Sequence, residues 1–366
     1  MSSLINTRQR GLIICFSLLV IIGILALFSG SPIYSLYHTG SPWYYILRHI
    51  LFGILPGIIF ALATYFLPIN FFQKLSSFFY FLSIFLLVLT YIPGLGLKVF
   101  GARRWINLGF LSFQPVEIIK PLLIIFFASF LAKKEKGSAL QKKDSFLQFL
   151  VLLLPIIFLV FFQPNMSNVI LISLIFGGMF FVAGGSLREL PLVLLCVGAI
   201  LGMGLILFPY QLGRFRGFLG AEKDPLGKGY QIRQSLIAIG SGGIFGKGFM
   251  EGVQKYFYLP SPISDTIFSI FAEETGFFGS ALLVILYFLI FYQSILIFKK
   301  SENFFISLLA FGIGFWIFLQ ASIHLAATLG LIPFTGMPLP LISYGSTSTA
   351  TILFGAGLLL KCAKEV

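Results

Sequence analysis

Long apolar segments alternate with short polar connections along almost the whole chain. Crossing the hydrocarbon core of a membrane takes about 20 predominantly apolar residues, and ten segments approach or exceed that length. The expected spans cover residues 11–29, 44–66, 73–92, 116–132, 146–163, 168–184, 189–209, 266–298, 303–326 and 344–361. The sixth and tenth are short, and the eighth is long. The pattern predicts an all-α integral membrane protein with about ten transmembrane helices, forming a single polytopic domain over residues 1–366.

The composition supports this prediction. Hydrophobic residues make up 58% of the chain and charged residues only 10%, whereas a soluble domain carries about 25% charged residues. The apolar run after Arg8 and Arg10 lacks a small-residue cleavage site, so we interpret it as the first span and not as a cleaved signal peptide. Cys15, Cys196 and Cys362 lie in or beside apolar runs without metal or disulfide spacing. We expect them to be small buried hydrophobic residues.

Lys and Arg are distributed unevenly among the short connections, and this bias predicts the orientation of the chain. The connections assigned to the cytoplasm hold Arg8, Arg10, Lys74, Lys133, Lys134, Lys136, Lys142, Lys143, Arg188, Lys299, Lys300, Lys361 and Lys364. The outer connections near 30–43, 163–168 and 326–343 hold none. With ten spans, both termini would be cytoplasmic. We therefore predict a multi-pass protein of the cytoplasmic (inner) membrane.

Two segments predicted to be outside depart from this bias. They are residues 98–120, with Lys98, Arg103, Arg104 and Lys120, and the long loop 210–265 between the expected seventh and eighth helices, with Arg214, Arg216, Lys223, Lys228, Arg233, Lys247 and Lys255. A long loop can be translocated despite its charge, so these cations could be tolerated passengers. The alternative is that they bind an anionic ligand such as phosphate at the outer membrane face. Nucleic acid is a poor candidate there, and the sequence holds no nucleic-acid module.

Acidic residues are scarce, which narrows the search for chemistry. Those predicted to be outside or embedded are Glu117, Glu222, Asp224, Glu251, Asp265, Glu273 and Glu274. Asp265 sits where the long loop enters the eighth expected span. One interpretation is a helix N-cap, a position that favours Asp. The other is a general base, because partial desolvation at an apolar boundary raises the pKa of a carboxylate.

Two pairs of charged residues have defined helical spacing. On a straight helix, Glu273 would face within about 80° of Asp265 and lie roughly 12 Å deeper, with Glu274 on the opposite side. These acids could be polar contacts between helices or catalytic groups. Glu117 and Lys120 are at i, i+3 spacing, which allows an ion pair on one helix face. That pair could be structural, or it could tune a cavity that holds phosphate.

Two further segments have an irregular composition. GARRWINLG at 101–109 combines two Arg with Trp105 and glycines, which predicts a short interfacial or re-entrant segment. TGMPLPLISYGSTST at 335–349 is broken by Pro and Gly and rich in hydroxyl groups. Such a composition is typical of irregular backbone that lines a cavity within a membrane protein.

Taken together and in order, these motifs resemble the SEDS family, the FtsW, RodA and SpoVE group of cell-wall proteins. The resemblance rests on GARRWINLG (101–109), FQPVEIIKP (113–121), GYQIRQSLIAIGSGGIFGKG (229–248), VQKYFYLP (253–260), SDTIFSIFAEETGFFG (264–279) and GLIPFTGMPLPLISYG (330–345). It implies a ten-helix bundle that polymerises lipid II, an undecaprenyl-pyrophosphate-linked disaccharide peptide, into glycan strands. It also implies a class B penicillin-binding protein transpeptidase as partner, among other divisome or elongasome membrane proteins.

The resemblance assigns roles to individual positions. Asp265 matches the family's catalytic aspartate in a TDFIF-like motif. Glu273 and Glu274 match the paired acids that follow it, and Glu117 and Lys120 match the family's QPxE…K pair. The candidates for binding substrate are Arg103, Arg104, Glu117, Lys120, Arg214, Lys228, Gln254, Lys255, Glu273 and Ser343. No metal ligand is predicted, although a divalent cation at the pyrophosphate is compatible with the hypothesis.

The sequence departs from the family pattern at four places. Asn165 replaces an acid, His324 stands where an Asn is usual, Ser346 replaces a Gly, and the motif at Asp265 reads SDTIF. These changes concern local packing and substrate contacts more than the reaction class. Some segments are more similar to FtsW and others to RodA, and we prefer the FtsW-like, septal interpretation.

Three hypotheses about function follow. In the preferred one, Asp265 takes a proton from a sugar hydroxyl of the acceptor lipid, and that oxygen attacks the anomeric carbon of the donor. Nearby cations then stabilise the leaving polyprenyl pyrophosphate. The rival is a transporter that flips lipid II without chemistry, which predicts charged residues along a path through the midplane. A non-enzymatic division scaffold would leave the outer cations unexplained.

Overall fold

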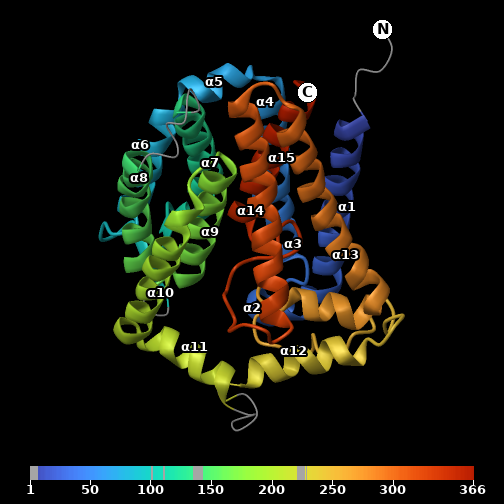
Figure 1. Cartoon of the computed structure of the whole chain (residues 1–366). Helices are drawn as coiled ribbons and strands as arrows, with labels where there is room; N and C mark the ends of the chain where they lie inside the picture. The colour runs from blue at the N-terminus through green and yellow to red at the C-terminus, as the bar shows by residue number, and fades with distance from the viewer. Residues whose placement is uncertain (1–6, 100–101, 110–111, 135–142, 221–226, 228) are drawn as a thin grey trace.

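In the computed structural model the chain is a bundle of helices with one small sheet (Figure 1). The structure describes residues 7–99, 102–109, 112–134, 143–220, 227 and 229–366. The first half holds α1 (Thr7–Gly30), α2 (Pro32–Thr39), α3 (Tyr44–His49), the π-helix η1 (Ile50–Ile54), α4 (Leu55–Phe66), α5 (Ile69–Lys74), α6 (Ser76–Leu89), α7 (Pro115–Lys134), α8 (Lys143–Phe162) and α9 (Met166–Val182). The second half holds the 3-10 helix η3 (Leu187–Glu189), α10 (Leu190–Leu207), α11 (Pro209–Leu219), α12 (Tyr230–Ser241), α13 (Ile267–Lys300), α14 (Phe304–Thr328) and α15 (Ser346–Lys364).

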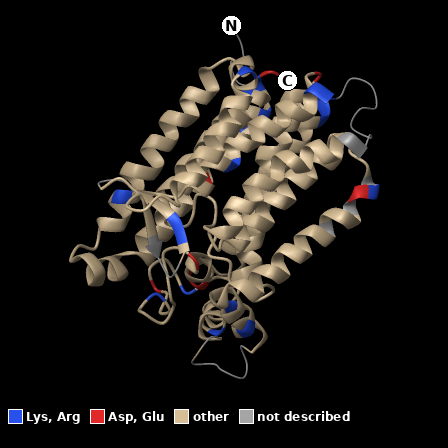
Figure 2. Cartoon of the chain, turned by 90° about the vertical axis from the view of Figure 1, so that its left-hand side faces the viewer, with Lys and Arg blue, Asp and Glu red and all other residues tan. Residues whose placement is uncertain are grey.

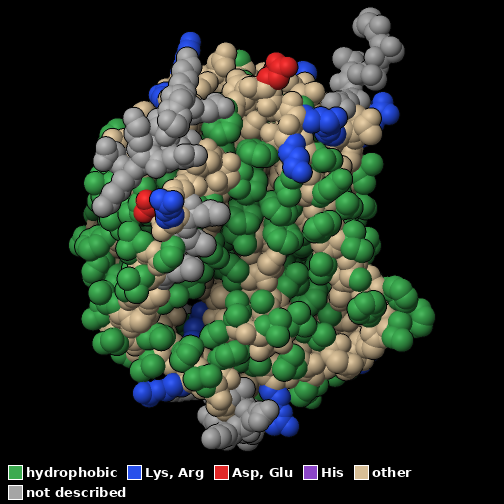
Figure 3. Space-filling model, viewed as in Figure 1, with side chains coloured by type: hydrophobic (Ala, Val, Ile, Leu, Met, Phe, Trp, Pro, Cys, Tyr) green, Lys and Arg blue, Asp and Glu red, His purple; other side chains and the backbone are tan. Residues whose placement is uncertain are grey.

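The surface of the bundle is divided into bands. Hydrophobic side chains cover the middle of the face seen in Figure 3, and most Lys and Arg lie near its two ends. The ribbon turned by 90° also shows charged residues at the top and bottom, with several others between the two ends (Figure 2). Helices that are apolar all round are either buried or in contact with lipid. The most buried apolar windows of the long helices belong to α7, α14 and α15, so these three helices lie at the centre of the bundle.

The two ends of the bundle differ. The start of α1, the end of α15 and the short helix α5 lie at the upper end in Figure 1. Helices α11 and α12 lie across the lower end, which we call the α12 end. The expected long loop 210–265 is therefore partly helical. Its described part folds over one end of the bundle as a cover.

The multi-pass class predicted from the sequence is confirmed, but the number of spans is not. Among the described residues, seven helices have the length and apolar composition of a span, or eight if α10 and α11, bent by 102°, count as one. Helices α6 and α9 are apolar but shorter. Each of the ten expected ranges overlaps a helix, and the count of ten stays a prediction.

The segment around Trp105 is not helical. Strands β1 (Gly96–Val99), β2 (Ala102–Asn107) and β3 (Ser112–Phe113) form an antiparallel sheet in the order β1-β2-β3. The segment expected to be interfacial or re-entrant is therefore an extended strand in its described residues, and its location at the membrane stays a prediction. Because successive side chains of a strand point to opposite faces, Arg103 and Arg104 are directed to different surroundings.

Helix α13 is broken near its start. Gly276 has φ 66° and ψ −159°, a backbone region open to glycine, and a Cβ here would clash with the backbone of Gly246. Residues 267–275 consequently lie across the α12 end, and the rest of α13 rises along the bundle (Figure 1). The offset of Glu273 from Asp265 along this first segment therefore runs across the α12 end, and the expectation that Glu273 lies about two turns deeper is wrong. The break also explains why this expected span was so long.

The connection between α14 and α15 folds back into the bundle. Its backbone carbonyls accept hydrogen bonds from the Tyr287 hydroxyl (2.6 Å, at Pro340) and from Gln320 Nε2 (3.0 Å, at Pro338). Leu341 packs against the backbone of α1 where Gly23 leaves no room for a Cβ. The predicted irregular backbone is confirmed over residues 335–345, and α15 begins at Ser346.

Candidate active site

Asp265 lies at the α12 end, in the turn just before α13. Thr266 is the N-cap residue of that helix, and no side-chain capping hydrogen bond is formed there. The Thr266 hydroxyl instead donates to the carbonyls of Pro260 (3.0 Å) and Ser261 (3.3 Å). The position of Asp265 one residue before the cap gives no support to the interpretation of this acid as a helix cap. Its half-buried carboxylate needs another explanation.

The turn that carries Asp265 is fixed from behind by the α14–α15 connection. Ser343 Oγ donates to the carbonyl of Ser264 (2.8 Å) and accepts from the backbone N–H of Leu339 (2.8 Å). The backbone N–H of Tyr344 donates to the carbonyl of Ile263 (2.8 Å). Ser343 is only 1% exposed. Although proposed from the sequence as a substrate contact, it is placed where it positions the backbone next to Asp265.

Two arginines supply the charge around Asp265. Burial raises the pKa of the Asp265 carboxyl above its ordinary value. Three interactions oppose that shift: the charge of Arg214, a hydrogen bond from Ser264 and the charge of Arg104. Burial likewise lowers the pKa of Arg104, assisted by the charge of Arg214 and opposed by that of Asp265. The three charged side chains therefore form one electrostatic cluster.

Arg104 reaches the cluster from β2. Its Nε donates to the carbonyl of Gln163 (3.1 Å), and a terminal nitrogen donates to the carbonyl of Pro164. Gln211 of α11 donates to the same Pro164 carbonyl (2.9 Å). The α8–α9 connection therefore joins the sheet to α11. Arg103, the exposed neighbour on the other face of the strand, donates to the Tyr91 carbonyl (3.2 Å) and is not among the charges that act on Asp265.

Arg214 reaches the cluster from α11. It donates to the carbonyl of Phe334 (3.2 Å), and its guanidinium carbon lies 4.8 Å from the ring centroid of Tyr210. Among the described residues, neither Arg104 nor Arg214 has a carboxylate within ion-pair distance. An arginine whose donors are only partly used by neutral carbonyls can still take a phosphate, which matches the fork of its N–H groups.

An apolar cavity opens beside Arg214. It has a volume of about 380 Å³ and is lined by α9, α10, α11, α14 and the connection near Phe334. Ser167, Gln211, Arg214 and Thr335 are its polar side chains, and the rest of its lining is apolar. A molecule with an anionic group at one end and a hydrocarbon chain at the other fits this arrangement.

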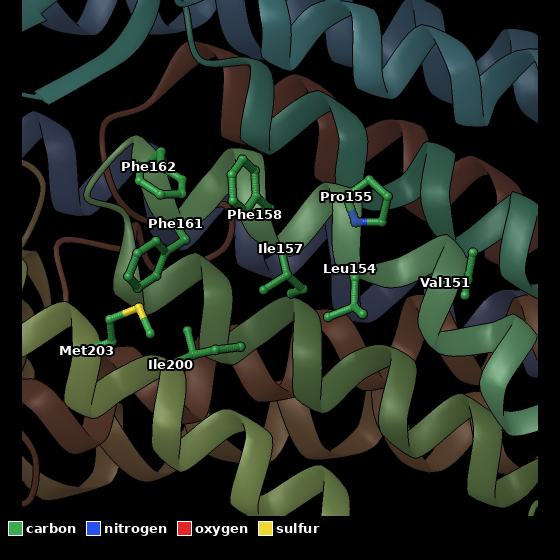
Figure 4. A pocket seen from close by; sticks show the side chains of 9 residues that line it. All are labelled: Val151, Leu154, Pro155, Ile157, Phe158, Phe161, Phe162, Ile200 and Met203. Atoms are coloured by element: carbon green, nitrogen blue, oxygen red, sulfur yellow. The ribbon is translucent and has the colours of Figure 1, made fainter.

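A larger cavity of about 680 Å³ lies between α8 and α10 (Figure 4). All nine of its lining residues are apolar, from Val151 at one end to Phe162 at the other. It contains no group that could perform acid–base or nucleophilic chemistry. It is suited to hydrocarbon, and the candidate site remains at Asp265.

Glu273 and Glu274 hold the cover onto the bundle. Glu273 Oε1 accepts from Lys247 Nζ (2.6 Å) and from the Val253 N–H (3.0 Å), and its Oε2 accepts from the Gln254 N–H (3.0 Å). Glu274 Oε1 lies 2.7 Å from the Nζ of Lys255. The substrate candidates Glu273, Gln254 and Lys255 thus take part in contacts that close the loop over residues 267–275.

The predicted ion pair of α7 is confirmed. Lys120 Nζ lies 2.8 Å from Glu117 Oε1 and 2.7 Å from Gln320 Oε1 of α14. Both charged side chains are almost fully buried, and the Lys120 nitrogen lies 5.5 Å from the centroid of the Trp316 ring. The pair belongs to the core between α7 and α14. Its contacts are with protein groups, as expected of a structural pair.

The remaining candidates and departures have these positions. Lys228 lies outside the described residues. Asn165 accepts a hydrogen bond from Asn168 (3.0 Å), and His324 Nδ1 lies 2.8 Å from the Met337 carbonyl oxygen. Arg48, which lies inside an expected span, was not predicted as a site residue. A single arginine one turn within an apolar segment was the signal that could have revealed it.

The fold and the site together define a class of protein: a multi-pass membrane protein with an acid and two arginines beside an apolar cavity at one end. The chain belongs to the FtsW/RodA/SpoVE family, described as cell cycle proteins, whose family model matches residues 9–366. This membership confirms the resemblance found in the sequence motifs.

Relatives and solved structures agree over nearly the full chain. The protein of Coxiella burnetii named "probable peptidoglycan glycosyltransferase FtsW" is 36% identical over 358 residues, covering 97% of this chain and 95% of its own length. A protein of the same name from Francisella salina is 35% identical, covering 94% and 86%. A chain from a peptidoglycan synthase complex that coordinates polymerization and crosslinking has a TM-score of 0.79 at 26% identity, covering 96% of both chains. The rod shape determining protein RodA of Thermus thermophilus gives 0.71 at 25% identity, covering 96% and 95%.

Proposed function

We propose that this chain is a peptidoglycan glycosyltransferase that polymerises lipid II into glycan strands at the outer face of the cytoplasmic membrane. The observation that carries the proposal is the electrostatic cluster of Asp265, Arg104 and Arg214 next to an apolar cavity. The relatives named as peptidoglycan glycosyltransferases support the same reaction class.

The proposed reaction is a single displacement with one general base. Asp265 accepts the proton of a sugar hydroxyl of the acceptor as that oxygen bonds to the anomeric carbon of the donor. The bond from that carbon to the pyrophosphate oxygen breaks, and polyprenyl pyrophosphate leaves with the electron pair. Arg104 and Arg214 stabilise the charge that develops on the leaving group. The proton on Asp265 then passes to water, which restores the base.

The described residues contain few side chains placed to coordinate a metal ion together. No group of three or more His, Cys, Asp or Glu side chains comes together among them. A divalent cation would therefore depend on the pyrophosphate oxygens of the substrate, with Asp265 as the nearby carboxylate. The two arginines can supply positive charge to the same phosphates.

Orientation and partners belong to the same proposal. We place the α12 end outside and the end with the termini in the cytoplasm, because the Lys and Arg of the short connections favour that side. The start of α1 and the end of α15 lie at the same end (Figure 1), which supports two cytoplasmic termini. The proposed partners are a class B penicillin-binding protein and other membrane proteins of the division machinery, with an FtsW-like septal role.

The rival hypothesis is a lipid II flippase without chemistry. It predicts charged groups accessible along a path through the bundle. The charged pair inside the bundle, Glu117 and Lys120, is 2% and 0% exposed and is engaged with protein groups. The charged cluster beside a cavity lies instead at the α12 end, which favours chemistry at one membrane face.

The deciding experiment is polymerisation of purified lipid II by the purified full chain, alone and with a class B partner, followed by separation of the glycan products. We expect long glycan strands that disappear in Asp265→Asn. Transfer of lipid II across proteoliposome membranes without any glycan product would support the flippase hypothesis and contradict ours.

A further inference from the structure

Arg48 is a charged residue that the proposed reaction leaves unused. It lies in α3, at the α12-end portion of the second expected span, and its Nη1 donates to the Tyr44 hydroxyl (2.8 Å). Its guanidinium carbon is 5.8 Å from the centroid of the Tyr44 ring. In the part of the chain that the structure describes, no carboxylate forms an ion pair with it. Charge within a membrane segment is costly and usually marks function.

A cavity of about 490 Å³ lies next to Arg48. Ser41, Tyr44 and Arg48 provide its polar part, and Leu47, Leu51 and Phe52 provide its apolar part. Leu47 and Leu51 are 53% and 55% exposed. A guanidinium with hydroxyl groups suits a phosphate, and the adjoining apolar surface suits a hydrocarbon chain in the membrane. The cavity therefore fits a phosphate-bearing lipid.

The backbone at this cavity is unusual. Residues Ile50–Ile54 form the π-helix η1, which contains Leu51 and Phe52. Single π-helical turns inside α-helices are rare and frequently occur at functional sites. This observation is independent of charge and cavity shape, and it points to the same turn of the second span.

The Arg48 cavity is connected to the Asp265 turn through Tyr344. The rings of Tyr45 and Tyr344 have centroids 5.1 Å apart, and the Tyr344 N–H donates to Ile263 two residues before Asp265. Burial raises the pKa of Tyr344 to about 12, and the charge of Arg48 acts in the opposite direction. Arg48 is not among the charges that act on Asp265. The Arg48 cavity is thus a neighbour of the catalytic cluster and separate from it.

The small sheet provides a second connection. Arg104 lies within β2, and Gly109, two residues beyond the end of that strand, lines the Arg48 cavity. Five residues of extended chain span at most about 17 Å. The Arg104–Arg214 cluster and the Arg48 cavity are therefore close enough for two lipid-linked molecules to reach one base.

We propose that the cavity at Arg48 and Tyr44 binds the phosphate of a second polyprenyl-linked substrate, so that donor and acceptor lipids are held at two separate arginine sites near Asp265. The identity of the ligand rests on the proposed function, because only a lipid-linked polymerase needs two polyprenyl chains. Arg48 and Tyr44 hold the phosphate, and Leu47, Leu51 and Phe52 contact the first isoprene units.

The test is native mass spectrometry of the purified full chain with undecaprenyl phosphate as the probe. We expect two bound copies for the unchanged chain, one for Arg48→Gln and one for Arg214→Gln. The affinity at the altered site should fall by roughly tenfold or more, as expected for lost hydrogen bonds to a charged group. Arg48→Lys should bind at an intermediate affinity, because lysine lacks the planar fork. Lys299→Gln, at the other end of the bundle, is the control and should bind two copies.

Competition identifies the ligand class. Undecaprenol, which has no phosphate, and inorganic pyrophosphate, which has no chain, should each displace the probe from the Arg48 site far less well than isotopically labelled undecaprenyl phosphate, which differs from the probe in mass. Leu51→Trp, an exposed position that leaves the charge intact, should also reduce binding by filling the cavity. It therefore tests the site even if Arg48→Gln does not fold.

Three results would overturn the proposal: one copy bound to the unchanged chain, two copies retained at full affinity by both Arg48→Gln and Leu51→Trp, or equal displacement by phosphatidylglycerol. The last would identify a general phospholipid site. These outcomes are independent of the polymerisation assay. A chain that binds two copies but makes no glycan would contradict the proposed function and leave the second binding site standing.

Discussion

Lys255 Nζ lies 2.7 Å from Glu274 Oε1, and both side chains are nearly fully buried at the α12 end. Ser29 of α1 completes the contact, since its Oγ donates to Glu274 (2.5 Å) and accepts from Lys255 (2.8 Å). Three segments far apart in the sequence meet at this carboxylate. A buried ion pair adds little net stability over an apolar contact. The Lys255–Glu274 pair nevertheless fixes the position of the cover on residues 267–275, and therefore the position of the Asp265 turn that precedes them.

Removing Lys255 should therefore destabilise the protein. In Lys255→Ala the buried Glu274 carboxylate keeps only a serine hydroxyl as partner, and an uncompensated buried charge costs about 3–5 kcal/mol. Lys247→Ala is the matched control: Lys247 is 34% exposed, and Glu273 would keep the N–H groups of Val253 and Gln254. Thermal unfolding of the purified variants in detergent should show the larger loss for Lys255→Ala. Equal losses would contradict this account of the cover.

Asp265→Asn should abolish catalysis without unfolding the protein. Asn preserves the size of the side chain but cannot accept the proton, and loss of a general base typically lowers the rate about 10²–10⁴-fold. Lipid II polymerisation is the readout, with chromatographic behaviour and helix content as checks of folding. Glu251→Gln, an exposed acid of the same loop, should retain near-normal activity. Near-normal polymerisation by a folded Asp265→Asn variant would remove Asp265 from the mechanism.

The rate should depend on pH through Asp265. The base is active when deprotonated, so kcat/KM should fall as pH decreases through its pKa, which burial holds above the ordinary value for Asp. Arg214 is the strongest of the groups that lower this pKa. In Arg214→Gln the pKa should rise further, and the acid side of the profile should move to higher pH.

The control for the pH profile is Arg103→Gln. Arg103 lies on the opposite face of the strand from Arg104 and is not among the charges acting on Asp265. Its removal should leave the position of the acid side unchanged. An unmoved profile in Arg214→Gln would mean that a different group controls the acid side of the rate.

Glu117 and Lys120 should behave as a coupled pair. Each single change to Ala leaves one buried charge without its partner, at about 3–5 kcal/mol. The double change removes both charges and should cost less than the sum of the two single changes, with a coupling of about 0.5–3 kcal/mol. The free energy of unfolding of the four proteins gives this coupling directly. Strict additivity would show that the 2.8 Å contact has no energetic significance.

The orientation can be tested by labelling single cysteines after the three natural ones are replaced. In intact cells, Ser261→Cys at the α12 end should react with a membrane-impermeant reagent. Glu302→Cys, between α13 and α14, should react only after the membrane is opened. Both positions are exposed, so access to the reagent decides the result. The reverse pattern would move the proposed active site to the cytoplasmic face.

The sequence by itself determined what depends on local composition and spacing. The membrane class follows from apolar runs, since each span is defined by its own residues. The Glu117–Lys120 pair follows from i, i+3 spacing on one helix. The place of Asp265 at a loop–helix boundary follows from the change in polarity around it. These properties are set within one or two turns of chain and need no knowledge of what packs alongside.

The tertiary structure decided what depends on distant partners. Gly276 breaks α13 because the turn at Gly246 packs against it, and this break moved Glu273 and Glu274 from an expected span into the contacts of the cover. The cluster of Arg104, Arg214 and Asp265 joins a strand, a helix and a turn. No spacing rule links such positions, because long-range contacts are fixed by the packing of whole elements. For the same reason, only the fold shows that Arg104 and Arg214 act on Asp265 whereas Arg48 lies at a second cavity.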